Sequence, residues 1–177
     1  MSQTWHSDDG AEDGARLSIV DWVRVVLRGV PLAILVFGGL AILLLLRLVE
    51  RPVFGVNRPV TPWITQAVCR LALRLLGIGF SMEGQTLSAR GAIVANHSSW
   101  LDIFALNACT RLYFVSKSEV AGWPGIGWLA RATGTVFIER NPARAREQTE
   151  LFRMRLHAGH RLLFFPEGTS TDGRRVL

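Results

Sequence analysis

The sequence is poor in cysteine, in lysine and in charge of either sign. Cys69 and Cys109 are its two cysteines, too few for a disulfide framework and not placed as a Cys-x-x-Cys zinc pair. We expect two reduced thiols in a reducing compartment. Among 177 residues, 19% are charged and 49% hydrophobic. This composition excludes a disordered chain and argues against a fully soluble protein, and the length suits one domain.

Several sequence motifs of common enzyme classes are missing. There is no Gly-x-Ser-x-Gly and no Gly-x-x-x-x-Gly-Lys, which disfavours a covalent hydrolase and a nucleoside triphosphatase. No metal site is expected. His157 and His160 are three residues apart without a nearby acidic partner, and we interpret them as an ordinary helix end.

The charges are unevenly distributed. Residues 1–46 carry three basic and five acidic residues (net −2), and residues 47–177 carry 17 basic and nine acidic residues (net +8), which sum to +6. A polar acidic segment (1–22) thus precedes a basic body. Such a body suits nucleic acid, anionic lipid, or an acidic protein or substrate.

The longest uncharged run, Gly29 to Leu46, has 18 residues. As a helix it would be about 27 Å long, close to the ~30 Å hydrocarbon core of a bilayer. We therefore predict a membrane segment at residues 23–51. A buried core helix is the alternative, and a signal peptide is disfavoured because the run starts late and follows an acidic stretch.

Details of the membrane insertion stay open. Pro31, Gly38 and Gly39 could kink the helix and give a re-entrant or two-part insertion. Arginines flank both ends of the run, so the positive-inside rule does not fix the orientation.

An amphipathic helix is expected to follow from Thr61-Pro62, which suits a helix start, to Gly77. Apolar residues repeat on one face at helical spacing: Trp63, Ala67, Leu71 and Leu75. Contact with anionic lipid and packing on the domain core are equally good interpretations.

Residues 52–177 are predicted to form an α/β domain with a mainly parallel sheet flanked by helices. Short apolar runs of strand length alternate with helical patterns. The predicted strands are 92–95, 112–115, 135–138 and 161–165, and the predicted helices are 99–108, 124–133 and 142–158.

Three polar clusters follow the first, third and fourth predicted strands, at 96–102, 139–141 and 166–170. Ligands of open α/β sheets bind beyond the carboxyl ends of the strands. One edge of the sheet is therefore expected to gather the clusters into one site.

His97 and Asp102 can form a base and its orienting acid. Asp102 would accept the proton-bearing ring nitrogen of His97, which leaves the other nitrogen free to take a proton from a hydroxyl. A helix start, with Ser98 or Ser99 as cap and Asp102 next to the positive helix end, explains the same spacing.

Glu167, Gly168 and Arg140 are further candidates. Gly168 permits a tight turn and close approach of a ligand, and Glu167 could hold an acceptor hydroxyl or brace the histidine. Arg140 could bind an anionic head group. The alternatives are a solvated acid at Glu167 and a surface ion pair of Arg140 with Glu139 or Glu147.

Together these clusters resemble three sequence blocks of the glycerolipid acyltransferases, specifically the 1-acylglycerol-3-phosphate acyltransferase family. Its Asn-His-x-x-x-x-Asp block is similar to Asn96, His97 and Asp102. Its second block resembles residues 134–140, and its Phe-Pro-Glu-Gly-Thr block resembles residues 165–169.

The resemblance implies a membrane-bound O-acyltransferase. His97, oriented by Asp102, would deprotonate the hydroxyl of a lysolipid, which then attacks a thioester. The implied co-substrate is acyl-CoA or acyl-carrier protein, with no cofactor, no metal and no nucleic acid. It also implies a bacterial inner membrane with a cytoplasmic site, and these substrate-binding residues: Asn96, Arg140, Glu167, Gly168 and Thr169.

Two features depart from the family pattern. Ser170 stands where the family usually carries an arginine associated with the acceptor phosphate, which resembles the branch that acylates lyso-ornithine lipid. The chain ends at Leu177, soon after the third block, so we expect a domain that is incomplete at its carboxyl end.

Two other function classes remain. One is a catalytically incomplete fragment or membrane-associated lipid-binding protein, supported by the short carboxyl end. The other is a nucleic-acid-binding module, based on arginine content alone, against which the membrane segment weighs.

Overall fold

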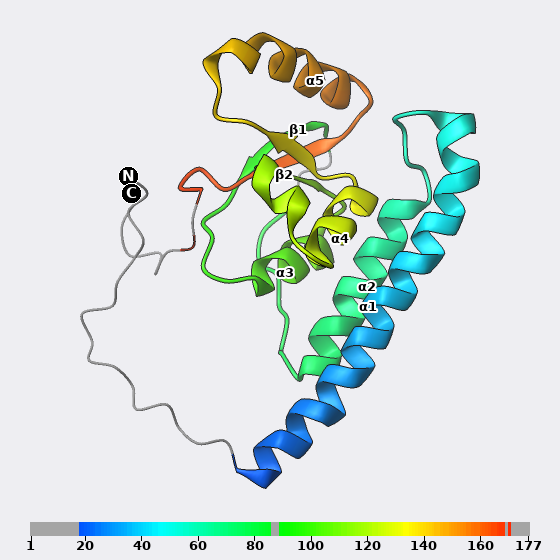
Figure 1. Cartoon of the computed structure of the whole chain (residues 1–177), viewed down its shortest axis with the longest axis vertical. Helices are drawn as coiled ribbons and strands as arrows, with labels where there is room; N and C mark the ends of the chain where they lie inside the picture. The colour runs from blue at the N-terminus through cyan, green and yellow to red at the C-terminus, as the bar shows by residue number, and fades with distance from the viewer. Residues whose placement is uncertain (1–17, 86–88, 169, 171–177) are drawn as a thin grey trace.

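The computed structural model describes residues 18–85, 89–168 and 170. A long helical hairpin stands beside a small α/β domain (Figure 1). The hairpin consists of α1 (Ile19–Phe54) and α2 (Thr61–Leu76), which lie side by side along most of α2. Residues 1–17, most of the predicted acidic segment, lie outside the described residues.

Helix α1 is continuous over 36 residues. A capping box fixes its first turn, because Ser18 Oγ accepts the N–H of Asp21 and the Asp21 carboxylate accepts the N–H of Ser18. Pro31 lies inside the helix without interrupting it, and the manner in which α1 is inserted in a membrane stays a prediction. The helix begins before residue 23 and ends after residue 51, the predicted bounds of the membrane segment.

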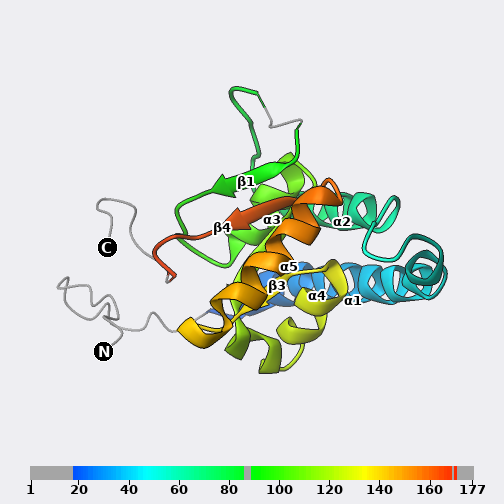
Figure 2. The same ribbon diagram turned by 90° about the horizontal axis from the view of Figure 1, so that it is seen from above.

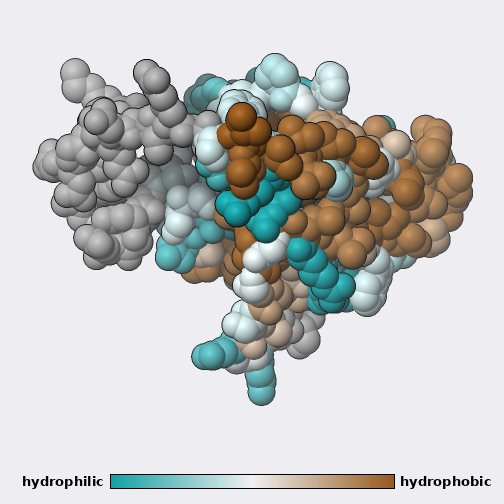
Figure 3. Space-filling view, turned by 90° about the horizontal axis from the view of Figure 1, so that it is seen from below, coloured by the Kyte–Doolittle hydropathy of each residue, from teal (hydrophilic) through white to brown (hydrophobic). Residues whose placement is uncertain are grey.

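The surface of α1 is apolar and exposed. Only 6% of its most apolar 18-residue stretch is buried among the described residues, which disfavours the alternative of a buried core helix. Seen from below, apolar side chains cover much of the side of the molecule on which α1 and α2 lie (Figure 3). Among the described residues, α1 is the helix that is long and apolar enough to be a candidate membrane span.

Helix α2 packs against the domain with one face and against α1 with another. Cys69 and Leu73 form a buried cluster with Ala108 of α3 (Leu101–Cys109). A Cβ atom at Gly39 of α1 would lie 2.6 Å from Val68 Cγ2, so the glycine permits the close approach of the two helices. The predicted apolar face, Trp63, Ala67, Leu71 and Leu75, stays exposed, so core packing is wrong for that face, and its contact with lipid stays a prediction.

The turn between the two helices is organised by a buried carboxylate. Glu50 accepts hydrogen bonds from the N–H groups of Val60 (2.8 Å) and Thr61 (3.2 Å) and from the Thr61 hydroxyl (2.7 Å). It also pairs with Arg47 at 3.1 Å. These bonds tie the end of α1 to the start of α2.

Four parallel strands form the sheet, in the order β1-β4-β2-β3. The prediction of a parallel sheet flanked by helices is confirmed, and the strand ends differ from the predicted ones by only one or two residues. The carboxyl ends of all four strands meet at one edge, as the arrowheads of β1 and β4 indicate (Figure 2). The strands are β1 (Gly91–Val94), β2 (Tyr113–Lys117), β3 (Val136–Ile138) and β4 (Arg161–Phe164).

Helices cover both faces of the sheet. α5 (Ala145–His157) packs on one face through Leu151, Phe152 and Leu156. α3 packs on the other face, where Leu106 meets Phe114 and Leu163. The remaining elements are η1 (Ser118–Gly122), α4 (Ile126–Thr133) and η2 (Pro142–Arg144), so the predicted helix 142–158 begins with a short 3₁₀ turn.

Candidate active site

The carboxyl edge of the sheet brings the predicted polar clusters together. His97 follows β1, Arg140 follows β3, and Glu167 and Gly168 follow β4. Because β1 and β4 are neighbours, the loop that carries His97 lies beside the turn that carries Gly168. The topology thus does what the sequence pattern predicted.

His97 and Asp102 form a close pair. Nδ1 of His97 lies 2.8 Å from Oδ2 of Asp102, and the same oxygen accepts the N–H groups of Ser98 (2.7 Å) and Ser99 (3.0 Å). Burial by itself would raise the pKa of Asp102, but the Ser99 N–H, His97 and the Ser98 N–H outweigh it, and the pKa is lowered. Asp102 is therefore ionised at neutral pH.

An ionised carboxylate accepts hydrogen bonds and donates none. In the neutral form of His97, Nδ1 therefore carries the proton and Nε2, on the other side of the ring, has the free lone pair. The alternative interpretation as a helix start also holds, since Asp102 lies in the first turn of α3 and Ser99 Oγ accepts the Leu101 N–H at 3.2 Å. Asp102 does both.

The ring of His97 is fixed by stacking. It lies on Phe165, with ring centroids 4.2 Å apart and an interplanar angle of 20°, and Phe165 stacks in turn on Phe114. The side chains of His97 and Asp102 are 22% and 24% exposed. The pair is thus held in place and can still be reached from outside.

Two cationic side chains converge on the turn after β4. Gly168 has a φ of +64°, and a Cβ atom there would lie 2.5 Å from Arg140 Nη2 and 3.6 Å from Lys117 Cε. The Gly168 N–H closes the turn by donating to the Phe165 carbonyl at 3.1 Å. This turn, with Arg140 and Lys117, can receive an anionic group close to the backbone.

Arg140 does not pair with either of the two acids that sequence reasoning named as its alternative partners. Within the described part of the chain, Glu139 pairs with Arg144 at 3.2 Å, and neither Glu139 nor Glu147 pairs with Arg140. The alternative of a surface ion pair between Arg140 and Glu139 or Glu147 is therefore wrong.

Sequence reasoning missed Lys117. It ends β2 at the same edge as the three clusters, within a polar run, Ser116 to Glu119, that the sequence analysis did not single out. Its signal was its rarity, because it is the single lysine in a chain that otherwise uses arginine.

The other candidates are less well defined. Asn96 is exposed and precedes His97, and Glu167 is half-buried on the turn with Gly168. Thr169 lies outside the described residues.

His97 and Asp102 have the geometry of a proton-transfer pair. The described residues contain no cluster of three His, Cys, Asp or Glu side chains that could hold a metal ion. Burial raises the pKa of Cys69 to about 12 and also raises that of Cys109, so both thiols are protonated at neutral pH. The two cysteines are free, as predicted.

Comparison with known proteins gives consistent matches. A family model described as Acyltransferase matches residues 80–177. The chain is 58% identical over 154 residues to the lyso-ornithine lipid O-acyltransferase of Rhodobacter capsulatus, covering 87% of this chain and 56% of that protein. It is 40% identical over 86 residues to a 1-acyl-sn-glycerol-3-phosphate acyltransferase of Neisseria gonorrhoeae, covering 48% and 34%.

A solved structure shares the fold. The 1-acyl-sn-glycerophosphate acyltransferase PlsC of Thermotoga maritima matches with a TM-score of 0.65 and 23% identity, covering 90% of this chain and 65% of that one. The lyso-ornithine lipid O-acyltransferase of Pseudomonas aeruginosa is 37% identical over 158 residues, covering 87% and 60%. The chain thus spans little more than half the length of these curated lyso-ornithine lipid relatives.

Proposed function

Because the chain belongs to the acyltransferase family, we propose that it is an O-acyltransferase that acylates the free hydroxyl of lyso-ornithine lipid. The observation that carries the proposal is the 2.8 Å contact between His97 Nδ1 and Asp102 Oδ2 at the carboxyl edge of the sheet. It supplies an oriented base where the ligands of parallel sheets bind.

In the proposed reaction, Nε2 of His97 takes the proton of the acceptor hydroxyl while the hydroxyl oxygen attacks the thioester carbonyl. The new C–O ester bond forms and the C–S bond breaks. The thiolate leaves and takes the proton back from His97, so the histidine returns to its neutral form. Asp102 stabilises the imidazolium between these steps.

The acceptor head group is assigned to the turn after β4. Ornithine carries a carboxylate, which the guanidinium of Arg140 and the ammonium of Lys117 can bind next to Gly168. Asn96, Glu167 and Thr169 belong to the same proposed acceptor site. Ser170, in place of the arginine that the related phosphate-binding block carries, and the 58% identity to the Rhodobacter capsulatus enzyme support this acceptor.

The donor is proposed to be an acyl thioester of acyl-carrier protein or coenzyme A, and the site of reaction a bacterial inner membrane with the catalytic edge on its cytoplasmic side. The exposed apolar surface of α1 supports the membrane location. Exposed Val94 and Trp100, on either side of His97 in the sequence, add apolar surface suited to an acyl chain.

Lysophosphatidic acid is the second candidate acceptor. The convergence of Arg140 and Lys117 on Gly168 would bind a phosphate as well as a carboxylate. The identity with the Neisseria gonorrhoeae enzyme supports this second acceptor over 48% of the chain.

The test offers both acceptors in parallel to membranes that contain the protein. Labelled acyl-carrier protein is the donor, with acyl-CoA in a second series. Label in ornithine lipid is the expected result. Label in phosphatidic acid alone would replace the first candidate by the second, and no label in either product with both donors would refute the proposed activity.

A further inference from the structure

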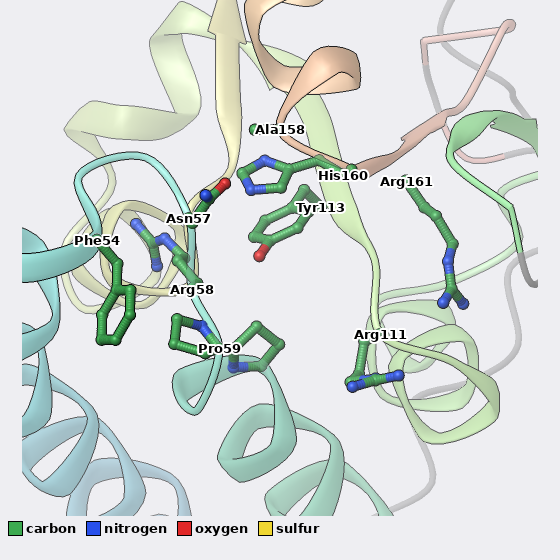
Figure 4. Close-up of a pocket in the computed structure, with 11 residues that line it drawn as sticks. Phe54, Asn57, Arg58, Pro59, Arg111, Tyr113, Ala158, His160 and Arg161 are labelled. Carbon is green, nitrogen blue, oxygen red and sulfur yellow. The ribbon is translucent and has the colours of Figure 1, made fainter.

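A second cavity opens at the opposite edge of the sheet. It has a volume of about 380 Å³ and lies where β2 and β4 begin, at the amino ends of strands whose carboxyl ends carry the candidate active site. The α1–α2 turn forms another wall. Its polar lining consists of Asn57, Arg58, Arg111, Tyr113, His160 and Arg161 (Figure 4).

His160 contributes a buried donor to this cavity. The residue is only 5% exposed, and its ring stacks on Tyr113 with centroids 4.1 Å apart. Arg155 Nη1 lies 3.3 Å from His160 Nδ1, and because a guanidinium can only donate, Nδ1 must accept. The proton of the neutral ring is therefore on Nε2, which is buried without a hydrogen-bond partner among the described residues.

Arg58, to the left of His160 in Figure 4, also has a buried donor without a hydrogen-bond partner among the described residues. Its Nη1 donates to the Ala132 carbonyl at 2.6 Å, but its buried Nε–H has no partner among the described residues. Buried donors without partners are rare in folded proteins and indicate a missing acceptor.

The cavity is also strongly cationic. Arg111 and Arg161 lie on the side away from Arg58 (Figure 4), and no aspartate or glutamate is among the described residues that line it. Glu50, an electrostatic neighbour of Arg58, is hydrogen-bonded to the α1–α2 turn and paired with Arg47. Arg111 stacks on Trp63 at 3.8 Å and Arg161 donates to Thr110 Oγ1, which holds both side chains in place while other N–H groups stay available.

We propose that this cavity binds a phosphate group, with the Nε2–H of His160 and the guanidinium group of Arg58 as its donors, while Arg111 and Arg161 on the other side add positive charge. Phosphate matches a set of donors without acceptors, because its oxygens accept several charge-assisted bonds at once. Phe54, at the end of α1, also lines the cavity. The head group of a phospholipid can therefore supply the phosphate, as can a soluble phosphate compound.

This site is distinct from the candidate active site and does not depend on the proposed acyl transfer. The experiment is calorimetric titration of the full chain in detergent at fixed ionic strength. One arm uses inorganic phosphate and the other uses dihexanoylphosphatidylglycerol, a soluble phospholipid. Binding in the first arm alone points to a soluble phosphate compound, and binding in the second alone points to a lipid head group.

Three variants locate the binding. His160→Phe keeps an aromatic ring on Tyr113 but removes the donor, and Arg161→Gln removes one charge at the cavity. Arg153→Gln removes the same charge from an exposed position on α5 and is the control. We expect saturable binding by the wild type, weakened roughly tenfold or more in His160→Phe, weakened by a smaller factor in Arg161→Gln and unchanged in the control.

Two results would overturn the proposal. One is the absence of saturable binding in both arms. The other is binding that Arg161→Gln and Arg153→Gln affect equally, which would mean general attraction to a basic protein. If His160→Phe does not fold, Arg111→Gln takes its place, because Arg111 is contributed by a different segment of the chain.

Discussion

Asp102 holds His97 with the same oxygen, Oδ2, that receives the backbone N–H groups at the start of α3. One carboxylate therefore sets the tautomer of the histidine and the path of the loop that carries it. The helix that begins there packs on the sheet through Leu106. The position of the base is thus built into the core of the domain.

Replacing Asp102 by asparagine should separate these two roles. Its side-chain oxygen can still accept loop N–H groups, but a neutral amide no longer stabilises the imidazolium or fixes the proton on Nδ1. We expect the acyl-transfer rate to fall by about 10²–10⁴-fold with little change in the unfolding temperature. Asp21→Asn, at the start of α1, is the control. An unchanged rate would show that Asp102 only organises the start of α3 and does not assist His97.

Two glycines with positive φ test the proposed acceptor site. A Cβ atom at Gly168 (φ +64°) would lie 2.5 Å from Arg140 Nη2, whereas one at Gly159 (φ +79°) meets nothing within 4 Å. Alanine at either position should lower the free energy of unfolding by about 1 kcal/mol through backbone strain. Only Gly168→Ala displaces Arg140, so it alone should raise the KM for the acceptor, roughly tenfold. Equal KM values in Gly168→Ala and Gly159→Ala would show that Arg140 does not bind the acceptor.

The buried carboxylate of Glu50 predicts a large effect on stability. Glu50→Ala leaves Arg47 and the Val60 and Thr61 donors without their acceptor, so the free energy of unfolding should fall by about 3 kcal/mol. Glu150→Ala, which breaks the exposed pair with Arg153, should cost less than about 1 kcal/mol. Chemical unfolding in detergent measures both, and similar losses would show that the turn is not held by Glu50.

His160 predicts a dependence of stability on pH. Burial, together with the positive charges of Arg155 and Arg58, lowers its pKa from 6.5 to about 4. Between these values the unfolded chain binds the proton more strongly than the folded protein does, so stability is complete above pH 6.5 and falls as the pH drops towards 4. The loss is at most about 3 kcal/mol.

The measurement compares unfolding at pH 7 and pH 4.5 for three proteins. His160→Phe should lose this part of the pH dependence, and His157→Phe, at an exposed position, should keep it. The same slope in wild type and His160→Phe would show that His160 is not buried in its neutral form.

Much of the fold followed from local pattern. The alternation of short apolar runs with helical segments predicted the parallel sheet, and the polar residues after three strands predicted which edge carries the site. These signals are strong because short apolar runs that alternate with helical segments along the chain are typical of a parallel sheet covered by helices. The bounds of α1 were less predictable, since its ends are fixed by Ser18 and by the Glu50 turn rather than by hydropathy.

The residues that were missed depend on tertiary contacts. Lys117 joins the site because β2 lies next to β4, and the order of the strands is not contained in any local pattern. His160 was interpreted as a helix end, but it is buried against Tyr113, a residue far away in the sequence. Neither contact leaves a periodic signal.

The most direct test of the account is the acyl-transfer rate of His97→Ala beside the wild type. Membranes with equal amounts of each protein receive lyso-ornithine lipid and labelled acyl-carrier protein, and circular dichroism of the purified proteins checks that both are folded. We expect the variant to lose at least about 10²-fold in rate while it keeps its fold. A folded variant that transfers acyl groups within a few-fold of the wild-type rate would contradict the assignment of His97 as the base.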